Sequence, residues 1–174
     1  MSGHIVEQDV LERVLGTALR TGGEFAEVFV EERTSSGISL DDRKVEELSS
    51  GQDRGAGIRV VVRETTGFAH TSDLSEQGLL HAAEVASAVA REGGSGSRTV
   101  ALDERRFAPP QPLVAKHHEV TKAAKVELLE RADDTARSNS SAIVQVTAGY
   151  GDSRRRTQIV NSDGLLTGEE SLRT

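Results

Sequence analysis

The N-terminal part of the chain shows a helical pattern of hydrophobic residues. In the segment DVLERVLGTALRTGG, apolar residues recur three and four positions apart and would form one stripe along a helix. Asp9 followed by Glu12 fits the capping-box pattern, and Gly22-Gly23 is a natural stop. The predicted stripe consists of Val10, Leu11, Val14, Leu15, Ala18 and Leu19.

Patterns typical of strands follow from Phe25. Apolar and charged residues alternate there, and we expect strands that are broken at residues 35–37 (SSG) and again at residues 41–43 (DDR). Residues 44–50 fit either a strand or a short helix. A strand is favoured because Gly51 and the next strand follow closely.

Residues 53–75, DRGAGIRVVVRETTGFAHTSDLS, have two interpretations: a ligand-binding loop, or two strands joined by a turn. Ile58, Val60 and Val62 alternate with their neighbours, as in a strand with one buried face. The turn signal ETTG follows at residues 64–67, and the chain would return over residues 67–72. The pattern therefore predicts a β-hairpin.

The glycines at the start of this hairpin do not complete a phosphate-binding motif. Gly55-Ala56-Gly57 could begin a dinucleotide fingerprint, which needs a third glycine three residues later and a helix that begins there. Position 60 is Val, and the residues that follow alternate as a strand. We interpret the glycines as relief of backbone crowding at a turn or bulge that enters the strand.

Two more helices are predicted. Ser75 would cap the first, and the second covers VTKAAKVELLERADDTARS, residues 120–138. The apolar positions of the first include Leu79, Leu80, Ala83, Val85, Ala86 and Val89. The expected apolar stripe of the second is Val120, Ala124, Leu128, Ala132 and Ala136. Between the two helices, residues 91–116 look irregular because they are rich in Gly and Pro.

The remainder of the chain has strand patterns. Residues 141–150 predict a strand, residues 151–153 (GDS) a turn, and residues 154–161 the partner strand. The expected apolar face of the first strand is Val144, Val146, Ala148 and Tyr150. Residues 161–164 (NSDG) are a strong turn signal, after which a third strand begins.

These elements predict an α+β fold with a largely antiparallel, hairpin-rich sheet and about three helices packed on it. We expect one domain over residues 1–174 with two lobes, 1–92 and 117–174, joined by the Gly/Pro-rich segment 93–116. A helix followed by hairpins occurs on either side of that segment. An internal repeat of the chain is therefore one alternative.

Composition narrows the class of protein. The 174 residues include no cysteine, which excludes disulfides and thiolate metal sites and favours a reducing compartment. The net charge of −7 argues against direct nucleic-acid binding. No apolar run approaches the ~18 residues of a membrane span, and the N-terminus has no signal-peptide pattern. We therefore expect a cytoplasmic protein without membrane contact.

The residues that could carry chemistry form no recognisable catalytic group. In His117-His118-Glu119, the pair His-Glu matches the start of the helical zinc-binding motif. That motif needs a second histidine four residues after the first, and Lys122 occupies this position. The other histidines, His4, His70 and His81, are scattered, and no serine lies in a G-x-S-x-G elbow.

Adjacent carboxylates and one basic run are interpreted as solvated surface. Neighbouring side chains diverge on a strand and lie ~100° apart on a helix, so they make no acid–base pair. The carboxylate pairs are Asp41-Asp42, Asp133-Asp134 and Glu169-Glu170. Residues 154–156 (RRR) fit a solvated hairpin edge. We assign no catalytic, cofactor-binding or metal-binding residue to this chain.

Several segments, taken in order, resemble the N-terminal region of the TldD/PmbA proteins. They are DRGAGIRV at 53–60, GFA at 67–69, TSDLS at 71–75, KVELLERAD at 125–133 and IVNSDG at 159–164. The likeness extends from about residue 9 to residue 174 and is greater for the TldD branch. It lies in the ordered set of segments and not in a single catalytic signature.

This resemblance implies part of a zinc metallopeptidase. The family was long labelled a modulator of DNA gyrase, and its members are similar to peptidases with a His-Glu-x-x-x-His helix in a C-terminal domain. A TldD-type subunit works with a PmbA-type partner on extended peptides in an enclosed chamber. This chain has no His-Glu-x-x-x-His. Zinc and the catalytic residues are therefore expected in a C-terminal metallopeptidase domain outside this chain, which should be inactive alone.

Two hypotheses for function follow from the resemblance. In the first, the chain is a non-catalytic scaffold that packs on the metal domain, contacts a PmbA-type partner subunit or associates with itself, and encloses an extended peptide. In the second, it is a protein-binding regulatory module that modulates DNA gyrase without hydrolysis. The acidic charge means that any effect on gyrase would run through protein contacts or through degradation of a gyrase poison.

Overall fold

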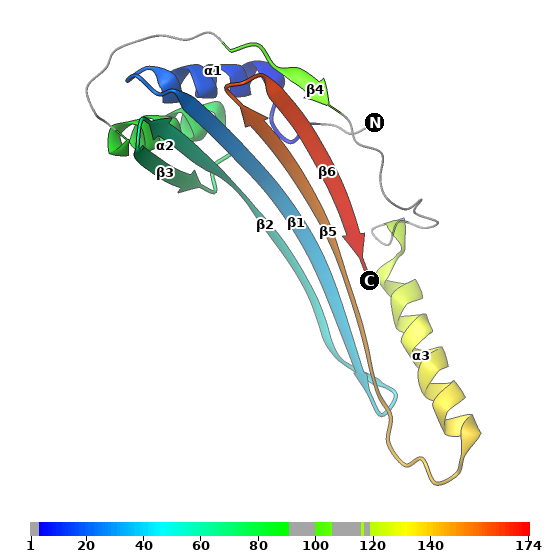
Figure 1. Cartoon of the computed structure of the whole chain (residues 1–174). Helices are drawn as coiled ribbons and strands as arrows, with labels where there is room; N and C mark the ends of the chain where they lie inside the picture. Colours follow the sequence, from blue (N-terminus) through cyan, green and yellow to red (C-terminus); the bar gives the residue numbers. More distant parts are fainter. Residues whose placement is uncertain (1–3, 91–99, 106–115, 117–118) are drawn as a thin grey trace. The chain divides into compact units, whose positions relative to one another are not determined.

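The computed structural model describes residues 4–90, 100–105, 116 and 119–174. Its elements, in chain order, are α1 (Gln8–Leu19), β1 (Phe25–Asp41), β2 (Lys44–Val62), β3 (Thr65–Thr71), α2 (Glu76–Val89), β4 (Asp103–Arg105), α3 (Lys122–Asn139), β5 (Thr147–Asn161) and β6 (Leu165–Arg173). Within the described residues, the strands form one six-stranded sheet in the order β3-β2-β1-β5-β6-β4 (Figure 1). The three helices and the mostly antiparallel sheet confirm the predicted α+β class.

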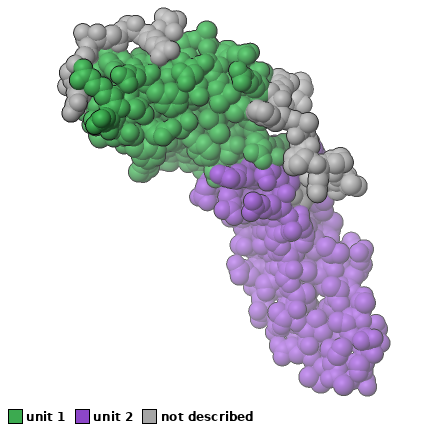
Figure 2. All heavy atoms as spheres, in the orientation of Figure 1, with its two compact units in different colours: residues 1–32, 54–108, 156–170 green, residues 33–53, 109–155, 171–174 purple. Residues whose placement is uncertain are grey.

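The chain divides into two compact units, which are coloured separately in Figure 2. Unit 1 comprises residues 1–32, 54–108 and 156–170, and unit 2 comprises residues 33–53, 109–155 and 171–174. The predicted division into lobes at residues 93–116 stays a prediction. No helix in the described part of the chain is long and apolar enough to cross a membrane.

Unit 1 is built by packing α1 and α2 on one face of the sheet (Figure 1). In α1, Leu11 and Leu15 are fully buried, as the predicted stripe requires. Ile58, Val60 and Val62 of β2 point into the same core, which confirms the alternation expected from the sequence. Fully burying one such aliphatic side chain contributes about 2 kcal/mol, so this core supplies most of the stability of unit 1.

The two predicted helix caps have different outcomes. α1 is preceded by Glu7, whose side chain makes no capping bond, so the capping box at Asp9 and Glu12 is wrong. Asp9 already lies inside the first turn, where its carboxylate cannot act as the cap. Ser75 does cap α2, because its Oγ accepts a hydrogen bond from the backbone N–H of Gly78 at 3.2 Å.

β1 and β2 are longer than predicted. β1 is continuous through residues 35–37, so the break predicted there is wrong. Small residues at this place let the two strands lie close together, since a Cβ on Gly37 would come within 2.9 Å of Ser49 Oγ. β2 includes residues 44–50, which confirms the favoured interpretation as a strand.

Both turns that flank β2 were predicted from the sequence, and one of them lies at a different position from the predicted one. Asp42 and Arg43 form the turn that precedes β2, and both have positive φ angles, 44° and 66°. The turn after β2 comprises Arg63 and Glu64, two residues earlier than expected. β3 then pairs antiparallel with β2, from Thr65 opposite Val62 onward.

The turn predicted at residues 151–153 is wrong, because β5 continues through it. The side chain of Asp152 is held by α3 and not by a local turn. Residues 154–156 therefore lie within a strand flanked by β1 and β6, so their interpretation as a hairpin edge is also wrong.

The NSDG turn is confirmed. The side-chain Oδ1 of Asn161 accepts hydrogen bonds from the N–H groups of Asp163 and Leu165, both at 3.1 Å. Gly164 has a φ of 93°, which a residue with a Cβ rarely adopts. β4 was not predicted: it lies in the segment expected to be irregular and pairs parallel with β6. Of the segment expected to be irregular, 91–116, residues 91–99 and 106–115 lie outside the described residues.

In unit 2, α3 packs on β1 and β5 through a small core formed by Ile38, Leu40 and Leu129. The helix was predicted, but its buried face was not. Its buried residues are Lys125, Leu129 and Asp133. The apolar stripe predicted to face the core is wrong, since Leu128 in that stripe is 45% exposed. Two charged residues take the inward positions because other side chains compensate their burial: Asp152 and Ser36 on the strands for Lys125, and two arginines for Asp133.

Gly67 offers a test of how closely α2 lies on β3. A Cβ at this position would come within 2.0 Å of the backbone carbonyl oxygen of Ala86. We predict that Gly67→Ala lowers the free energy of unfolding by at least about 2 kcal/mol, because the helix must move off the strand. Chemical denaturation followed by circular dichroism measures this.

The matched control is Gly151→Ala, also in a strand, where a Cβ would meet nothing within 4 Å. This variant should change the free energy of unfolding by less than about 1 kcal/mol. Equal stabilities for the two variants would contradict the described packing of α2.

Candidate functional site

The histidines do not come together in the described structure. His4 lies 3.5 Å from a carboxylate oxygen of Glu104. His70 stacks on Phe68 in β3, with 6.4 Å between the ring centroids, and His81 lies on α2. Residues 117–118 lie outside the described part. Among the described residues, no group of three His, Asp or Glu side chains could hold a metal ion.

The glycines at residues 55–57 lie inside β2, which confirms the strand interpretation. Their predicted placement at a turn or bulge that enters the strand is wrong, because β2 already begins at Lys44. A Cβ on Gly57 would come within 3.1 Å of the Phe68 ring, and one on Gly55 within 3.0 Å of the carbonyl oxygen of Thr71. These glycines therefore permit close contact between β2 and β3, and they do not form a phosphate loop.

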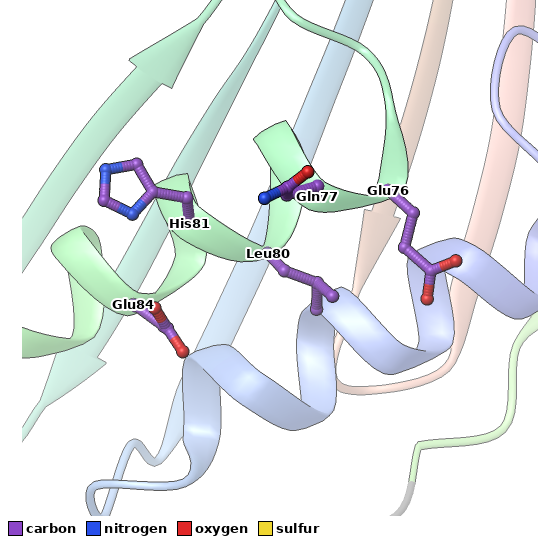
Figure 3. A pocket seen from close by; sticks show the side chains of 5 residues that line it. All are labelled: Glu76, Gln77, Leu80, His81 and Glu84. Atoms are coloured by element: carbon purple, nitrogen blue, oxygen red, sulfur yellow. The ribbon is translucent and has the colours of Figure 1, made fainter.

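A shallow hollow of about 580 Å³ lies on α2. It is lined by Glu76, Gln77, Leu80, His81 and Glu84. Figure 3 shows Glu76, Leu80 and Glu84 directed toward α1, whereas His81 projects away from it.

Both carboxylates of this hollow are already paired with arginines of α1. Glu76 lies 2.6 Å from Arg13, and Glu84 lies 3.5 Å from Arg20. Two carboxylates that are each bound to a guanidinium do not form a general acid–base pair. The hollow is therefore the polar rim of the contact between the helices.

Unit 2 contains a buried ion pair between Lys125 of α3 and Asp152 of β5, whose side chains are 7% and 6% exposed. Lys125 also donates a hydrogen bond to Ser36 Oγ at 3.3 Å, and Ser36 Oγ donates to Asp152 at 2.9 Å. The Lys125 ammonium lies 5.3 Å from the centroid of the Tyr150 ring, within the range of a cation–π contact.

Burial and hydrogen bonding together set the pKa of Asp152 and of Tyr150. Burial raises the pKa of Asp152, but hydrogen bonds from Lys125, Ser36 and Tyr150 outweigh it and lower the pKa below the usual value. Burial raises the pKa of Tyr150, and its hydrogen bond to Asp152 raises it further. Asp152 is therefore held as a carboxylate beside Lys125.

Ser36 and Lys125 together resemble a serine–lysine catalytic pair, but the geometry excludes that role. A lysine that activates a serine must accept its proton, and here Asp152 is bound to the ammonium. The cluster instead holds α3 against β1 and β5 through an ion pair and hydrogen bonds.

A second buried charge lies two turns along α3. The side chain of Asp133 is fully buried and lies 2.9 Å from Arg137 and 3.4 Å from Arg43 of the β1–β2 turn. The sequence interpretation of residues 133–134 as solvated surface is wrong for Asp133, because these arginines compensate its burial. Residues 125, 129 and 133 lie four apart and share one face of the helix, but only the partners of Lys125 and Asp133 in the folded chain show that this face is the buried one.

The face of unit 1 opposite the helices carries the aromatic side chains. In β1, Ala26, Val28 and Val30 are buried in the core, so Phe25 and Phe29 point to the other face. Phe68 in β3 points the same way, because its neighbour Gly67 faces α2, and it is 59% exposed.

Arg59 lies among these aromatic residues. We call Phe25, Phe29, Phe68 and Arg59 together the open face. It is paired opposite Phe68 across the strands, and its guanidinium lies 5.7 Å from the centroid of the Phe25 ring. It also lies 3.3 Å from Glu27. The open face is thus apolar with a central charge pair, a composition typical of contact surfaces and not of catalytic sites.

Comparison with known proteins assigns this arrangement to a family. The model of "PmbA/TldA metallopeptidase domain 1" matches residues 26–90, and that of "PmbA/TldA metallopeptidase central domain" matches residues 115–174.

Two curated relatives are similar over most of the chain. A "Metalloprotease TldD homolog" of Haemophilus influenzae is 28% identical over 151 residues, which cover 84% of this chain and 30% of that protein. "Metalloprotease PmbA" of Escherichia coli O157:H7 is 27% identical over 173 residues, which cover 96% of this chain and 38% of that protein. The chain thus spans about a third of the length of these relatives.

A solved structure shares the fold. A protein of Thermotoga maritima, described as a candidate modulator of a DNA gyrase, superposes with a TM-score of 0.73 at 16% sequence identity. The match covers 95% of this chain and 37% of that protein.

The buried ion pair gives a prediction about unit 2. Replacing Lys125 with Met leaves the Asp152 carboxylate buried without its cation. We predict a loss of about 3 kcal/mol in the free energy of unfolding, measured by urea denaturation. The exposed Lys122 on the same helix is the control, and Lys122→Met should change stability by less than about 0.5 kcal/mol. If Lys125→Met were as stable as the control, the ion pair would not hold α3 in place.

Proposed function

This chain belongs to the PmbA/TldD metallopeptidase family, and we propose that it is the non-catalytic N-terminal scaffold of such a peptidase. In this proposal it packs on a catalytic domain that carries the zinc ion, contacts a PmbA-type partner subunit and helps to enclose unfolded peptides. Two findings support the proposal: the matched models are those of the first and central domains, and the chain spans about a third of the length of its relatives.

The observation that carries the proposal is the open face. Phe25, Phe29 and Phe68 lie on the side of the sheet that α1 and α2 leave uncovered. Phe68 is 59% exposed, whereas Phe25 and Phe29 are half-buried. Apolar side chains that remain partly uncovered on a sheet face usually mark a place where another polypeptide binds. Arg59 and Glu27 neutralise each other at its centre, so the face suits a partner without strong charge.

If the open face lines the chamber of such a peptidase, it explains how the enzyme selects its substrates. A chamber enclosed by sheet surfaces admits an unfolded chain and excludes a folded protein. Aromatic side chains bind varied apolar residues through contact area, with little dependence on sequence. The proposal assigns no step of the zinc chemistry to the described residues, which bind and orient the peptide.

The purified chain should bind an unfolded peptide without cutting it. We expect a fluorescently labelled casein peptide to gain anisotropy on mixing with the chain, and Phe29→Lys to weaken this binding at least tenfold, because it places a charge on the open face. The control is Val45→Lys, at an exposed valine of β2 outside the open face.

Three results would contradict the proposal. One is cleavage of the peptide by the chain alone, one is a stoichiometric zinc content by metal analysis, and one is equal binding by Phe29→Lys and the control. Thermal unfolding of both variants by circular dichroism checks that they are folded.

A second candidate function is modulation of DNA gyrase through protein contacts, and the description of the Thermotoga maritima protein favours it. It predicts that the immobilised chain retains purified gyrase at physiological salt, and that DNA does not compete, because the chain carries a net charge of −7. Failure to retain gyrase at micromolar concentration would leave the scaffold role as the better account.

A further inference from the structure

The aromatic residues of unit 1 lie outside its core. The chain has only four phenylalanines and one tyrosine, and it has no tryptophan. The buried members of the unit 1 core that the structure describes are all Val, Leu, Ile or Ala. Three of the four phenylalanines, Phe25, Phe29 and Phe68, lie instead on the open face. An apolar surface can be built from aliphatic side chains, so these rings add a property that aliphatic side chains lack, which is the electron-rich face of an aromatic ring.

The ring of Phe68 lies over a glycine of the neighbouring strand. Gly57 of β2 is paired with His70, which follows Phe68 by two positions in β3. A Cβ on Gly57 would come within 3.1 Å of the Phe68 ring, so the ring occupies the space where a side chain at position 57 would lie. Phe68 nevertheless remains 59% exposed. The ring is therefore supported by the backbone of β2 and accessible from outside.

Flat side chains continue on both sides of Phe68. The His70 ring stacks on it, with 6.4 Å between the centroids and 26° between the ring planes. Arg59 lies directly opposite Phe68 on β2, and its guanidinium lies 5.7 Å from the centroid of the Phe25 ring on β1. These side chains span three adjacent strands. We call them the stacking row, which consists of Phe25, Arg59, Phe68 and His70.

The charge of Arg59 is compensated, although its side chain is not covered. Glu27 lies 3.3 Å from the guanidinium, and the Arg59 side chain is still 47% exposed. A planar guanidinium attracts the electron-rich face of an aromatic ring, and the attraction is stronger when water is displaced. Because Glu27 already compensates the full charge, a carboxylate of a ligand gains little here. The electrostatic complement of the stacking row is therefore an aromatic ring and not an anion.

We propose that the stacking row binds aromatic side chains, so that the open face prefers unfolded peptides that contain Phe, Tyr or Trp. This inference rests on the proposed function, in which the open face binds an unfolded peptide. A ring of the peptide stacks on Phe68 or on the guanidinium of Arg59 and gains an attraction beyond that of its apolar area. An aliphatic side chain of equal size gains the area alone. The preference is for a type of side chain, and it sets no order of residues in the peptide.

Single-stranded nucleic acid is the competing occupant, because its bases are also flat. Proteins that bind it combine aromatic side chains with a basic groove along the phosphates. The stacking row has one arginine, which Glu27 compensates, and the chain carries a net charge of −7. This charge repels phosphates, whereas the backbone of a peptide is neutral. Charge therefore favours the aromatic peptide.

The test compares two fluorescently labelled casein peptides that differ in one side chain. One contains a single phenylalanine, and the other contains cyclohexylalanine in its place, which has the same carbon skeleton but no π electrons. Fluorescence anisotropy measures the affinity of each peptide for the unmodified chain. We expect the phenylalanine peptide to bind at least about threefold more tightly, because only its ring can stack on the row.

A double variant tests where this preference arises. Phe68→Leu combined with Arg59→Met keeps the apolar area of the stacking row but removes one ring and the guanidinium. The two peptides should then bind with affinities within about 1.5-fold of each other. The control is Val45→Ala, at an exposed valine of β2 outside the open face, which should keep the preference. Thermal unfolding by circular dichroism checks that both variants are folded.

Two results would overturn the inference alone: equal binding of the two peptides by the unmodified chain, and an unchanged preference in the double variant. The proposed function would survive either result, because the peptides still bind. If neither peptide bound, the proposed function would fail together with the inference. A labelled oligothymidine that bound more tightly than the phenylalanine peptide at physiological salt would assign the stacking row to nucleic acid and would also overturn the inference.

Discussion

The structure depends on one constraint, which is that α1 and α2 cover only one face of the sheet in unit 1. Ile58, Val60 and Val62 meet the helices there, and the alternation of a strand then forces their neighbours to the other face. Three phenylalanines and Arg59 are placed outward by the same alternation that builds the core. The core and the open face are therefore two consequences of one pattern, and a substitution that shifts the register would exchange them.

Unit 2 is stabilised in a different way. Its apolar core is small, with Ile38, Leu40 and Leu129 as the buried members, and two buried carboxylates supply further contacts. Asp152 is held by Lys125, and Asp133 by Arg137 and Arg43. Buried ion pairs add little net stability, but breaking one is costly, so they fix which face of α3 lies on the strands.

The limits of prediction from sequence follow from the same physics. The helix α1 and the strand at residues 58–62 were predictable because their burial follows the hydrophobic period. The inward face of α3 was not, because Lys125 is compensated by Asp152 and Ser36, which lie far from it in the sequence. Small polar residues at 35–37 and 151–153 looked like turns, although they lie within long strands and form contacts there. The family resemblance was predictable from the ordered segments, whereas the open face required the alternation of three strands to be known together.

The central claim is that the open face receives another polypeptide. Oxidative footprinting of Phe25 and Phe29, with and without a saturating unfolded peptide, tests this most directly. The account predicts that both rings are labelled in the chain alone and become several-fold less reactive in the complex, while Leu80 on α2 does not change. Unchanged labelling of Phe25 and Phe29 in a solution where the peptide is bound would contradict it.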